Sequence, residues 1–293
     1  IWVAAGTYKP NRPANNLNTI DVNNRSNAFV LKSDIKIFGG FPSTGNPDMT
    51  QRDWNINVTT LSGDIGTIND STDNCYHVVI SSGAIGVAEL NGFTVTKGLS
   101  NEYTAIIVND NYISNDIGGG MYNAASNPFI VNCKFSQNTA KNGGGMFNIN
   151  STPIVSKSTF SENFSEYSGG GMFNSSSSPI ITNSTFSGNK AHSGGGVYII
   201  FSSPTITNCI FSGNSATEIA GGMYINSSSP MITNCFFSGN SATEMAGGMY
   251  NHTSSPTITN SNFSGNSAYY GGGMSNYYSS PTITISAFSG NTA

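Results

Sequence analysis

One unit recurs seven times after Gly118, and it constrains the fold more than any other feature of the chain. The unit reads GGGM(Y/F)N, a few polar residues, and then SSPTITN(C/S)xFSGNSA. Its prolines are 25 or 26 residues apart, at Pro128, Pro153, Pro179, Pro204, Pro230, Pro256 and Pro281. A drift of at most one residue per copy indicates a stack of equivalent structural units.

The length and composition of the unit select the architecture. Helical repeats are longer, at about 33 to 47 residues, and leucine-rich repeats need leucines that are nearly absent here. The apolar runs are short, alternate with polar residues and end at Gly, Ser or Pro, which is typical of strands. We therefore predict an all-β, right-handed, single-stranded parallel β-helix with one coil per 25–26 residues and two or three strands per coil. About a dozen coils at ~4.8 Å would give a rod of roughly 55 Å.

The pleat assigns the columns that face the interior. The second residue after each proline is aliphatic, and we expect Ile206, Ile232 and Ile258 to lie in one file inside the coil. A bend at the intervening position, usually Asn, two residues after the isoleucine, would place a column of Ser and Cys inside as well. Further inward columns are expected for the phenylalanines and the methionines, including Phe211, Phe237, Phe263, Met121, Met146, Met172, Val197, Met223, Met249 and Met274.

Asparagines and glycines mark the corners. Asn214, Asn240 and Asn266 of the FSGN element resemble an asparagine ladder at a tight turn, where Asn tolerates a left-handed backbone. The GGG run supplies positive φ and close backbone approach at another corner. Proline stands at the start of a strand, where its missing N–H matters least.

The four cysteines, Cys75, Cys133, Cys209 and Cys235, show neither a CxxC pair nor a metal-ligand spacing. Three of them occupy the small-residue column, so we predict buried free thiols. Cys209 and Cys235 are stacked neighbours. Parallel side chains rarely meet disulfide geometry, although a bridge between these two remains the alternative.

The chain divides into two stretches of one continuous domain. Residues 1–117 read as irregular coils with loops inserted at 9–19, 42–57 and 99–117, and residues 118–293 as seven regular repeats. The chain begins in a strand-like run without Met and ends in a truncated repeat. We expect a piece of a longer protein.

A family resemblance follows from particular segments. IWVAAGTYKP, DIKIFGGF, RDW, LSGDI and LNGFTVTKG look like the opening of bacterial right-handed parallel β-helix surface proteins. The FSGN and GGGMYN elements are similar to the FxxN and GGA-type repeats of polymorphic outer-membrane proteins, with GGGM or GGM in place of GGA and an aliphatic residue. The resemblance implies export, a place outside the cell or on its surface, and often adhesion.

Charge and the length of the apolar runs exclude two classes of partner. Charged residues are 9% of the chain, the net charge is −4, and Arg is almost absent, so we expect no nucleic-acid partner. No apolar run approaches the ~20 residues that cross a bilayer, so we expect no membrane-spanning segment.

Catalytic motifs are missing. The pectinase patterns NTD, DD, GHG and RIK do not occur, and residues 117–293 contain neither Asp nor Arg. Glu218 and Glu244 share one repeat position and would stack as like charges on a loop edge. We assign no catalytic residue and no cofactor.

The remaining candidates lie mostly in the first third. Asp64, Asp70 and Asp73 could form a weak Ca²⁺ site, although solvated turn residues are the simpler interpretation. Arg52 and Asp53 would pin a loop, and His77 has no assigned role. His192 and His252 are expected to be exposed in loops.

We expect a non-enzymatic, extracellular or cell-surface structural or adhesive β-helix, such as a fibre or stalk segment. Its expected partners are copies of itself end to end and a host or matrix glycan or protein. A carbohydrate-binding or polysaccharide-degrading β-helix is the alternative, and Tyr269, Tyr270, Tyr277 and Tyr278 could stack on sugars or on a protein. Ice binding through an outward threonine ladder is a minor alternative, because four apolar residues interrupt its second column. The ladder comprises Thr182, Thr207, Thr233, Thr259 and Thr284, and the interruptions are Phe129, Ile154, Ile180 and Met231.

Overall fold

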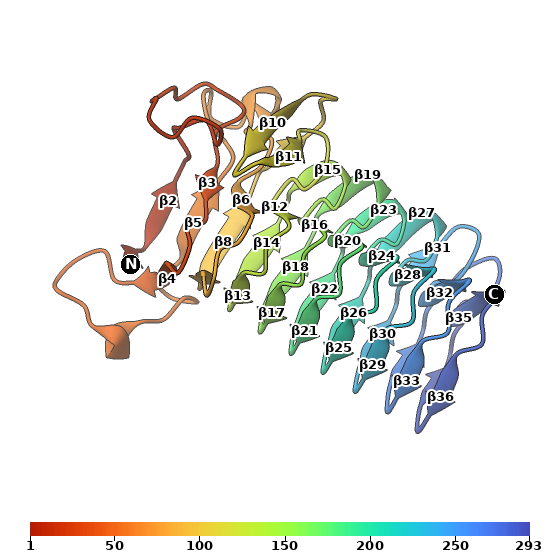
Figure 1. The fold of residues 1–293 in the computed structure, drawn as a ribbon. Coiled ribbons are helices and arrows are strands. Elements are labelled where there is room, and N and C mark those ends of the chain that lie inside the picture. Colours follow the sequence, from red (N-terminus) through yellow and green to blue (C-terminus); the bar gives the residue numbers. More distant parts are fainter.

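Four parallel sheets run along the chain because most regular coils contribute one short strand to each sheet; the last two coils contribute only isolated bridges to the fourth sheet. The computed structural model describes residues 1–293 as a right-handed parallel β-solenoid with only two short 3₁₀ helices (Figure 1). The predicted fold class is confirmed. The strand number per coil was underestimated, because four strands are present where two or three were expected.

The isoleucine sheet, named for its inward column, has ten strands. They are β1 (Trp2–Ala4), β4 (Lys36–Phe41), β7 (Glu89–Asn91), β13 (Phe129–Val131), β17 (Ile154–Ser156), β21 (Ile180–Thr182), β25 (Thr205–Thr207), β29 (Met231–Thr233), β33 (Thr257–Thr259) and β36 (Thr282–Thr284). Ile206 pairs in parallel register with Ile232, which pairs with Ile258, and all three side chains are fully buried. The predicted file of isoleucines is therefore confirmed.

The phenylalanine sheet also has ten strands. They are β2 (Gly6–Tyr8), β5 (Thr59–Ser62), β8 (Phe93–Thr96), β14 (Lys134–Ser136), β18 (Thr159–Ser161), β22 (Thr185–Ser187), β26 (Ile210–Ser212), β30 (Phe236–Ser238), β34 (Asn262–Ser264) and β37 (Ala287–Ser289). The rings of Phe211, Phe237 and Phe263 stack inside, with centroids 4.6 Å apart. This offset stacking adds to the free energy of burying each ring.

The methionine sheet has nine strands. They are β3 (Phe29–Val30), β6 (Val79–Ser82), β12 (Met121–Ala124), β16 (Met146–Ile149), β20 (Met172–Ser175), β24 (Val197–Ile200), β28 (Met223–Asn226), β32 (Met249–His252) and β35 (Met274–Tyr277). Its methionine column is buried from Met121 to Met249, as expected, and Met274 in the last coil is half-buried.

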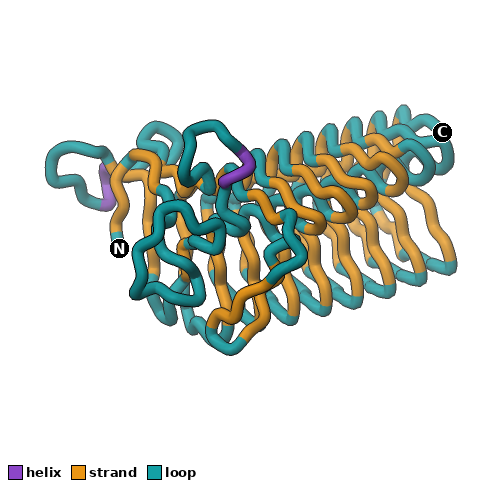
Figure 2. Tube along the Cα trace, turned by 90° about the horizontal axis from the view of Figure 1, so that it is seen from above, coloured by secondary structure: helices purple, strands orange, loops and turns teal.

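The alanine sheet is shorter, with six strands. They are β9 (Leu99–Ser100), β15 (Thr139–Asn142), β19 (Phe164–Ser168), β23 (Lys190–Ser193), β27 (Ser215–Ile219) and β31 (Ser241–Ala242). Ala140, Ala191 and Ala216 point inward from it. The stacked coils and the loops gathered beside the N-terminal coils are visible in Figure 2.

The ten layers of the long sheets correct the expected dozen coils. At ~4.8 Å per layer, the distance from first to last strand is about 43 Å rather than 55 Å. The reason lies in residues 1–117, where loops consume so much chain that only three layers form, at β1, β4 and β7.

Two bends follow each isoleucine strand. The residue that makes the bend was predicted correctly for the first bend only. The Asn after the isoleucine strand adopts positive φ, for example 55° at Asn208 and 54° at Asn234. At the second bend the prediction was wrong, because the ladder asparagine itself does not adopt the left-handed backbone. The residue before it does, with φ of 61° at Gly213 and Gly239, and this leaves the Asn side chain free to point inward.

The GGG run forms the next corner, where two features of the backbone favour glycine. The first residue of the GGG run has positive φ, as predicted, although Ala220 and Ala246 adopt it in two copies. A Cβ on the last glycine, such as Gly222, would collide with the carbonyl oxygen of Gly248 in the adjacent coil. Close backbone contact between coils therefore excludes a side chain there.

Serine ladders accompany the asparagine ladder. The first Ser of the SSP element is buried in every copy except the last, and its Oγ accepts a backbone N–H of the preceding coil at 2.8–3.1 Å. The serines of the Ser and Cys column do the same, as in Ser158 N–H to Ser184 Oγ at 3.2 Å. The four cysteines are free and buried, in agreement with the prediction.

The segment 99–117 was expected to be an inserted loop. It instead forms a strand followed by a hairpin. β10 (Ala105–Val108) and β11 (Asn111–Ser114) pair antiparallel across Asn109 and Asp110, which have φ of 47° and 62°. Two left-handed residues make the tight turn that matches hairpin twist. The insertion at 42–57 carries η1 (Met49–Gln51), and the connection between β5 and β6 carries η2 (Ser71–Asp73). None of the helices has the length and apolar character that crossing a bilayer requires.

Candidate functional site

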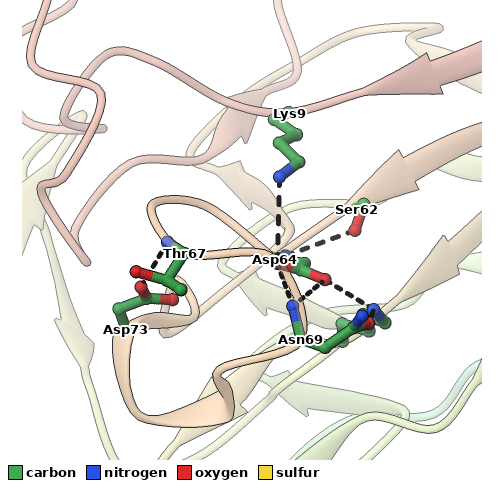
Figure 3. Close-up of polar contacts among 7 residues, drawn as sticks. Lys9, Ser62, Asp64, Thr67, Asn69 and Asp73 are labelled. Atoms are coloured by element: carbon green, nitrogen blue, oxygen red, sulfur yellow. Dashed lines mark hydrogen bonds and ion pairs between the residues drawn. The ribbon is translucent and has the colours of Figure 1, made fainter.

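Asp64 forms ion pairs and hydrogen bonds with several neighbouring residues of the N-terminal third (Figure 3). Its carboxylate lies 2.5 Å from Lys97 Nζ and 3.8 Å from Lys9 Nζ, and it accepts the backbone N–H of Asn69. Burial opposes its ionisation, but the hydrogen bonds and charges of these neighbours hold the pKa below its usual value. Asp64 is therefore an ionised residue that ties three segments together.

Asp70 and Asp73 serve other local purposes. Asp70 caps η2 by accepting from the N–H and the hydroxyl of Thr72, which lowers its pKa. Asp73 accepts from the backbone N–H of Thr67 at 2.7 Å. The three aspartates do not converge, and no group of three acidic, His or Cys side chains is placed to hold a metal ion. Because Ca²⁺ takes six to eight oxygens, these residues do not fit the Ca²⁺ site considered above.

A groove opens between the 42–58 segment and the outer face of the phenylalanine sheet. It has a volume of about 450 Å³ and combines a tryptophan, two lysines and two threonine hydroxyls. The residues that matter below are Trp54, Thr94, Lys134, Lys157 and Thr159. No acidic side chain lines it. This site was not foreseen from the sequence, because its walls come from segments far apart in the chain.

Arg52 fixes the wall of this groove. Its guanidinium donates to Gly39 O at 2.7 Å and to Asn91 O and Oδ1 at 3.0 and 2.6 Å, and it lies 4.8 Å from the Trp54 ring centroid. Asp53 accepts the N–H groups of Asn55 and Ile56 within the same loop. The expectation that Arg52 and Asp53 pin a loop is confirmed.

His77 is buried beneath the hairpin. Its Nδ1 lies 2.9 Å from Gly118 O and 3.2 Å from Ser100 Oγ, while Nε2 has no partner. Burial lowers the pKa of His77 to about 4, against the smaller opposing effects of the Gly118 hydrogen bond and the Asp116 charge. The imidazole is a neutral structural group, out of reach of a substrate.

The other two histidines were expected in loops, and both lie in strands. His192 is exposed on β23, where Nε2 contacts Glu218 Oε2 at 2.6 Å. His252 is half-buried on β32 and stacks on Tyr277 with ring centroids 5.4 Å apart. Glu218 is thus paired with a histidine. The stacking of Glu218 and Glu244 holds only for their backbones, through the Glu244 N–H to Glu218 O bond.

An aromatic ladder on the outside of the methionine sheet was also missed. The residue after the inward methionine or valine is aromatic in every coil from Met121 to Met249, and successive rings of Phe173, Tyr198 and Tyr224 stack with centroids 4.9 and 4.6 Å apart. At the N-terminal end, the hairpin buries Tyr122 and Phe147 of the same column. Since the rings cover one another's faces, only their edges are open to solvent.

The exposed surface candidates of the later copies lie apart from this ladder. Tyr269 and Tyr270 form one T-shaped pair, and Tyr277 and Tyr278 form another. The threonine column faces outward as predicted, with Thr259 Oγ1 3.1 Å from Thr284 Oγ1. Met231 and Ile180 protrude from the column beside it, so no flat two-column threonine array forms.

Comparison with known proteins agrees with the fold. Residues 96–229 match the family model described as a right handed beta helix region. Such regions occur both in enzymes and in proteins without enzymatic activity. A search of curated proteins found no match.

Proposed function

We propose that this right-handed β-helix is a non-enzymatic, extracellular or cell-surface structural and adhesive segment. The observation that carries the proposal is the unbroken register of like side chains, with asparagine, serine, aliphatic and phenylalanine columns that are buried in every regular coil except the last. Such a solenoid gains its stability from contacts between neighbouring coils and keeps its lateral surface rigid. The resemblance to FxxN and GGA-type surface repeats supports the location.

The uneven distribution of loops supports a display role. The regular coils turn through tight bends, whereas the long insertions and the hairpin gather beside the N-terminal coils (Figure 2). The 42–58 segment contributes Trp54 to the groove, which also includes Lys134 and Lys157 of the first regular coils. A rod that carries irregular loops at one end presents them away from the rest of its surface. The fibre or stalk role includes association of copies end to end.

The proposal is tested with one preparation of the chain in two assays. Immobilised protein is probed with extracellular-matrix proteins and a glycan array, and soluble protein is incubated with acidic and neutral polysaccharides while reducing ends and unsaturated products are measured. Saturable binding without product supports the proposal. Catalytic turnover of any of the polysaccharides, or the absence of binding to every probe, contradicts it. Sedimentation velocity over a range of concentrations measures end-to-end association.

Carbohydrate binding is a second candidate, favoured by the groove at Trp54. An aromatic side chain beside several hydrogen-bonding groups in a concave surface is suited to a sugar. The outer aromatic ladder is not suited in the same way, because its ring faces are already stacked on one another.

A further inference from the structure

Two lysines without acidic partners project into the groove at Trp54. Lys134 lies on β14 and Lys157 at the bend before β18, and both side chains are exposed. None of the ion pairs of the structure involves either lysine. In a chain with a net charge of −4, the groove is thus a local patch of uncompensated positive charge.

The two ammonium groups belong to neighbouring coils. Lys134 pairs in register with Thr159, which follows Lys157 by two residues, so the lysines are separated by about one coil spacing of ~4.8 Å along the axis. Like charges that line one groove repel one another. An anionic group between them removes that repulsion and accepts charge-assisted hydrogen bonds from both.

The rest of the groove is built for a hydroxylated ring rather than for a bare anion. Trp54 is half-buried, and the contacts of Arg52 hold its backbone and ring in place. On the opposite side, Thr94 and Thr159 project outward from β8 and β18, the two strands that flank β14, with Lys134 between them in register. A sugar ring offers C–H groups to the indole and hydroxyls to the threonines.

We propose that this groove binds an acidic sugar residue of a glycan. Lys134 and Lys157 bind the carboxylate or sulfate group, Trp54 packs against the apolar face of the pyranose, and the threonine hydroxyls bond to its hydroxyl groups. The inference rests on the carbohydrate-binding candidate above and names its ligand class. The low Arg content and negative net charge favour a sugar over a nucleic acid, whose binding needs many phosphate contacts.

Tryptophan fluorescence reports on the site directly. The chain has two tryptophans, and Trp2 lies at the N-terminal end, stacked on Phe41. The Trp2→Phe variant therefore leaves Trp54 as the only tryptophan. It is titrated at low salt with trigalacturonic acid, a heparin tetrasaccharide, galactotriose and a short single-stranded DNA. We expect saturable quenching or enhancement with at least one acidic saccharide, and binding that weakens as NaCl is added.

Charge-neutralising variants complete the test. In the Trp2→Phe background, Lys134→Gln with Lys157→Gln should weaken acidic-saccharide binding by at least about tenfold. Lys190→Gln, an exposed lysine of β23 outside the groove, is the matched control and should bind as before. Unchanged circular dichroism spectra and melting temperatures show that the variants are folded.

The result that overturns the inference is the absence of a saturable response to both acidic saccharides. Equal binding of galactotriose or DNA, or equal loss in the Lys190→Gln control, overturns it too. None of these outcomes touches the structural and adhesive proposal, which is tested by the array and sedimentation experiments. Catalytic turnover in those assays would overturn that proposal while leaving the groove assignment intact.

Discussion

Asn214 Oδ1 accepts two hydrogen bonds from Asn189, one from its backbone N–H and one from its side-chain amide, both at 3.0 Å. Asn214 in turn donates to Phe186 O at 2.9 Å and to Asn240 Oδ1 at 2.9 Å. Each ladder asparagine thus satisfies buried groups in the coils on both sides. The ladder connects the coils through polar contacts as the isoleucines and phenylalanines connect them through apolar ones.

Replacing Asn214 by Leu should destabilise the solenoid by about 2–5 kcal/mol. The substitution leaves the backbone N–H of Asn189 without a partner, removes one of the two hydrogen bonds of the Asn189 side-chain amide and removes the side-chain donor to Phe186 O. Each unsatisfied buried group costs about 1–3 kcal/mol. Urea unfolding followed by circular dichroism measures the change in the free energy of unfolding. Asn262→Thr is the control, because Thr185 occupies the same outward column, and it should change stability by less than about 0.5 kcal/mol. Equal effects of the two substitutions would contradict the ladder's role.

The buried His77 should make the fold sensitive to mild acid. Its pKa is about 4 when folded against an ordinary value of 6.5, so the unfolded state binds more protons between these values and stability falls as the pH drops from about 6.5 to 4. The loss amounts to about 3 kcal/mol once the pH is below 4. The lowered pKa values of Asp64 and Asp70 act only below their usual value of 3.8.

The measurement is the free energy of unfolding of the wild type and His77→Asn at pH values from 7 to 4. The variant should lose most of the pH dependence in this window, whereas His192→Asn should retain it. An unaltered slope in the His77→Asn variant would show that another group titrates.

The Ser and Cys column should accept serine at Cys209. In neighbouring copies the serine Oγ accepts a backbone N–H, as Ser261 does from Cys235 at 3.1 Å. Cys209→Ser offers the same acceptor to the N–H of Ser184, so stability should stay within about 1 kcal/mol of the wild type. Cys209→Leu adds volume to the packed interior and should cost about 1–3 kcal/mol. Chemical denaturation distinguishes the two outcomes.

The thiols themselves can be counted. With all four cysteines free and buried, a thiol reagent should label none in the native protein and four after denaturation without reductant. Two labelled thiols after denaturation would mean that Cys209 and Cys235 are bridged.

Glycines at different corners should differ in their tolerance. Gly222→Ala forces a Cβ against the backbone of the next coil and should destabilise the protein by about 1–3 kcal/mol. Gly213 has φ of 61° and open space around its Cα, so Gly213→Asn, which tolerates this backbone, should be nearly neutral. Thermal melts of both variants provide the comparison. A neutral Gly222→Ala would contradict the close approach of the coils.

The fold was predictable from sequence wherever identical letters recur at one repeat position. The files of Ile206 and Phe211 could be assigned inward because strand alternation leaves no other place for a repeated large apolar residue. The residue with the left-handed backbone at the second bend was assigned wrongly because most repeats have two asparagines at or next to a bend. The one at Asn208 takes the strained backbone, and the one at Asn214 is buried.

The groove and the hairpin were beyond this reasoning for a different reason. Trp54 lies on an inserted segment and Lys134 on a regular coil, and only the stacking of the coils brings them together. The repeat period gives no information about the position of an inserted segment. The turn at Asn109 and Asp110 lacks the glycine that usually marks a hairpin. The aromatic ladder did carry a signal, the aromatic residue that follows the inward methionine or valine in six successive coils, and it was not used.

In-register stacking of neighbouring coils is the central claim, and spin labels on the outward threonine column test it most directly. Thr207 and Thr233 pair in adjacent layers, whereas Thr182 lies one layer further from Thr233. We expect strong dipolar broadening of the electron paramagnetic resonance spectrum when the two labels are placed in the double variant Thr207→Cys and Thr233→Cys. In the double variant Thr182→Cys and Thr233→Cys, the broadening should be clearly weaker. Equal broadening in the two pairs, or none in the first, would contradict it.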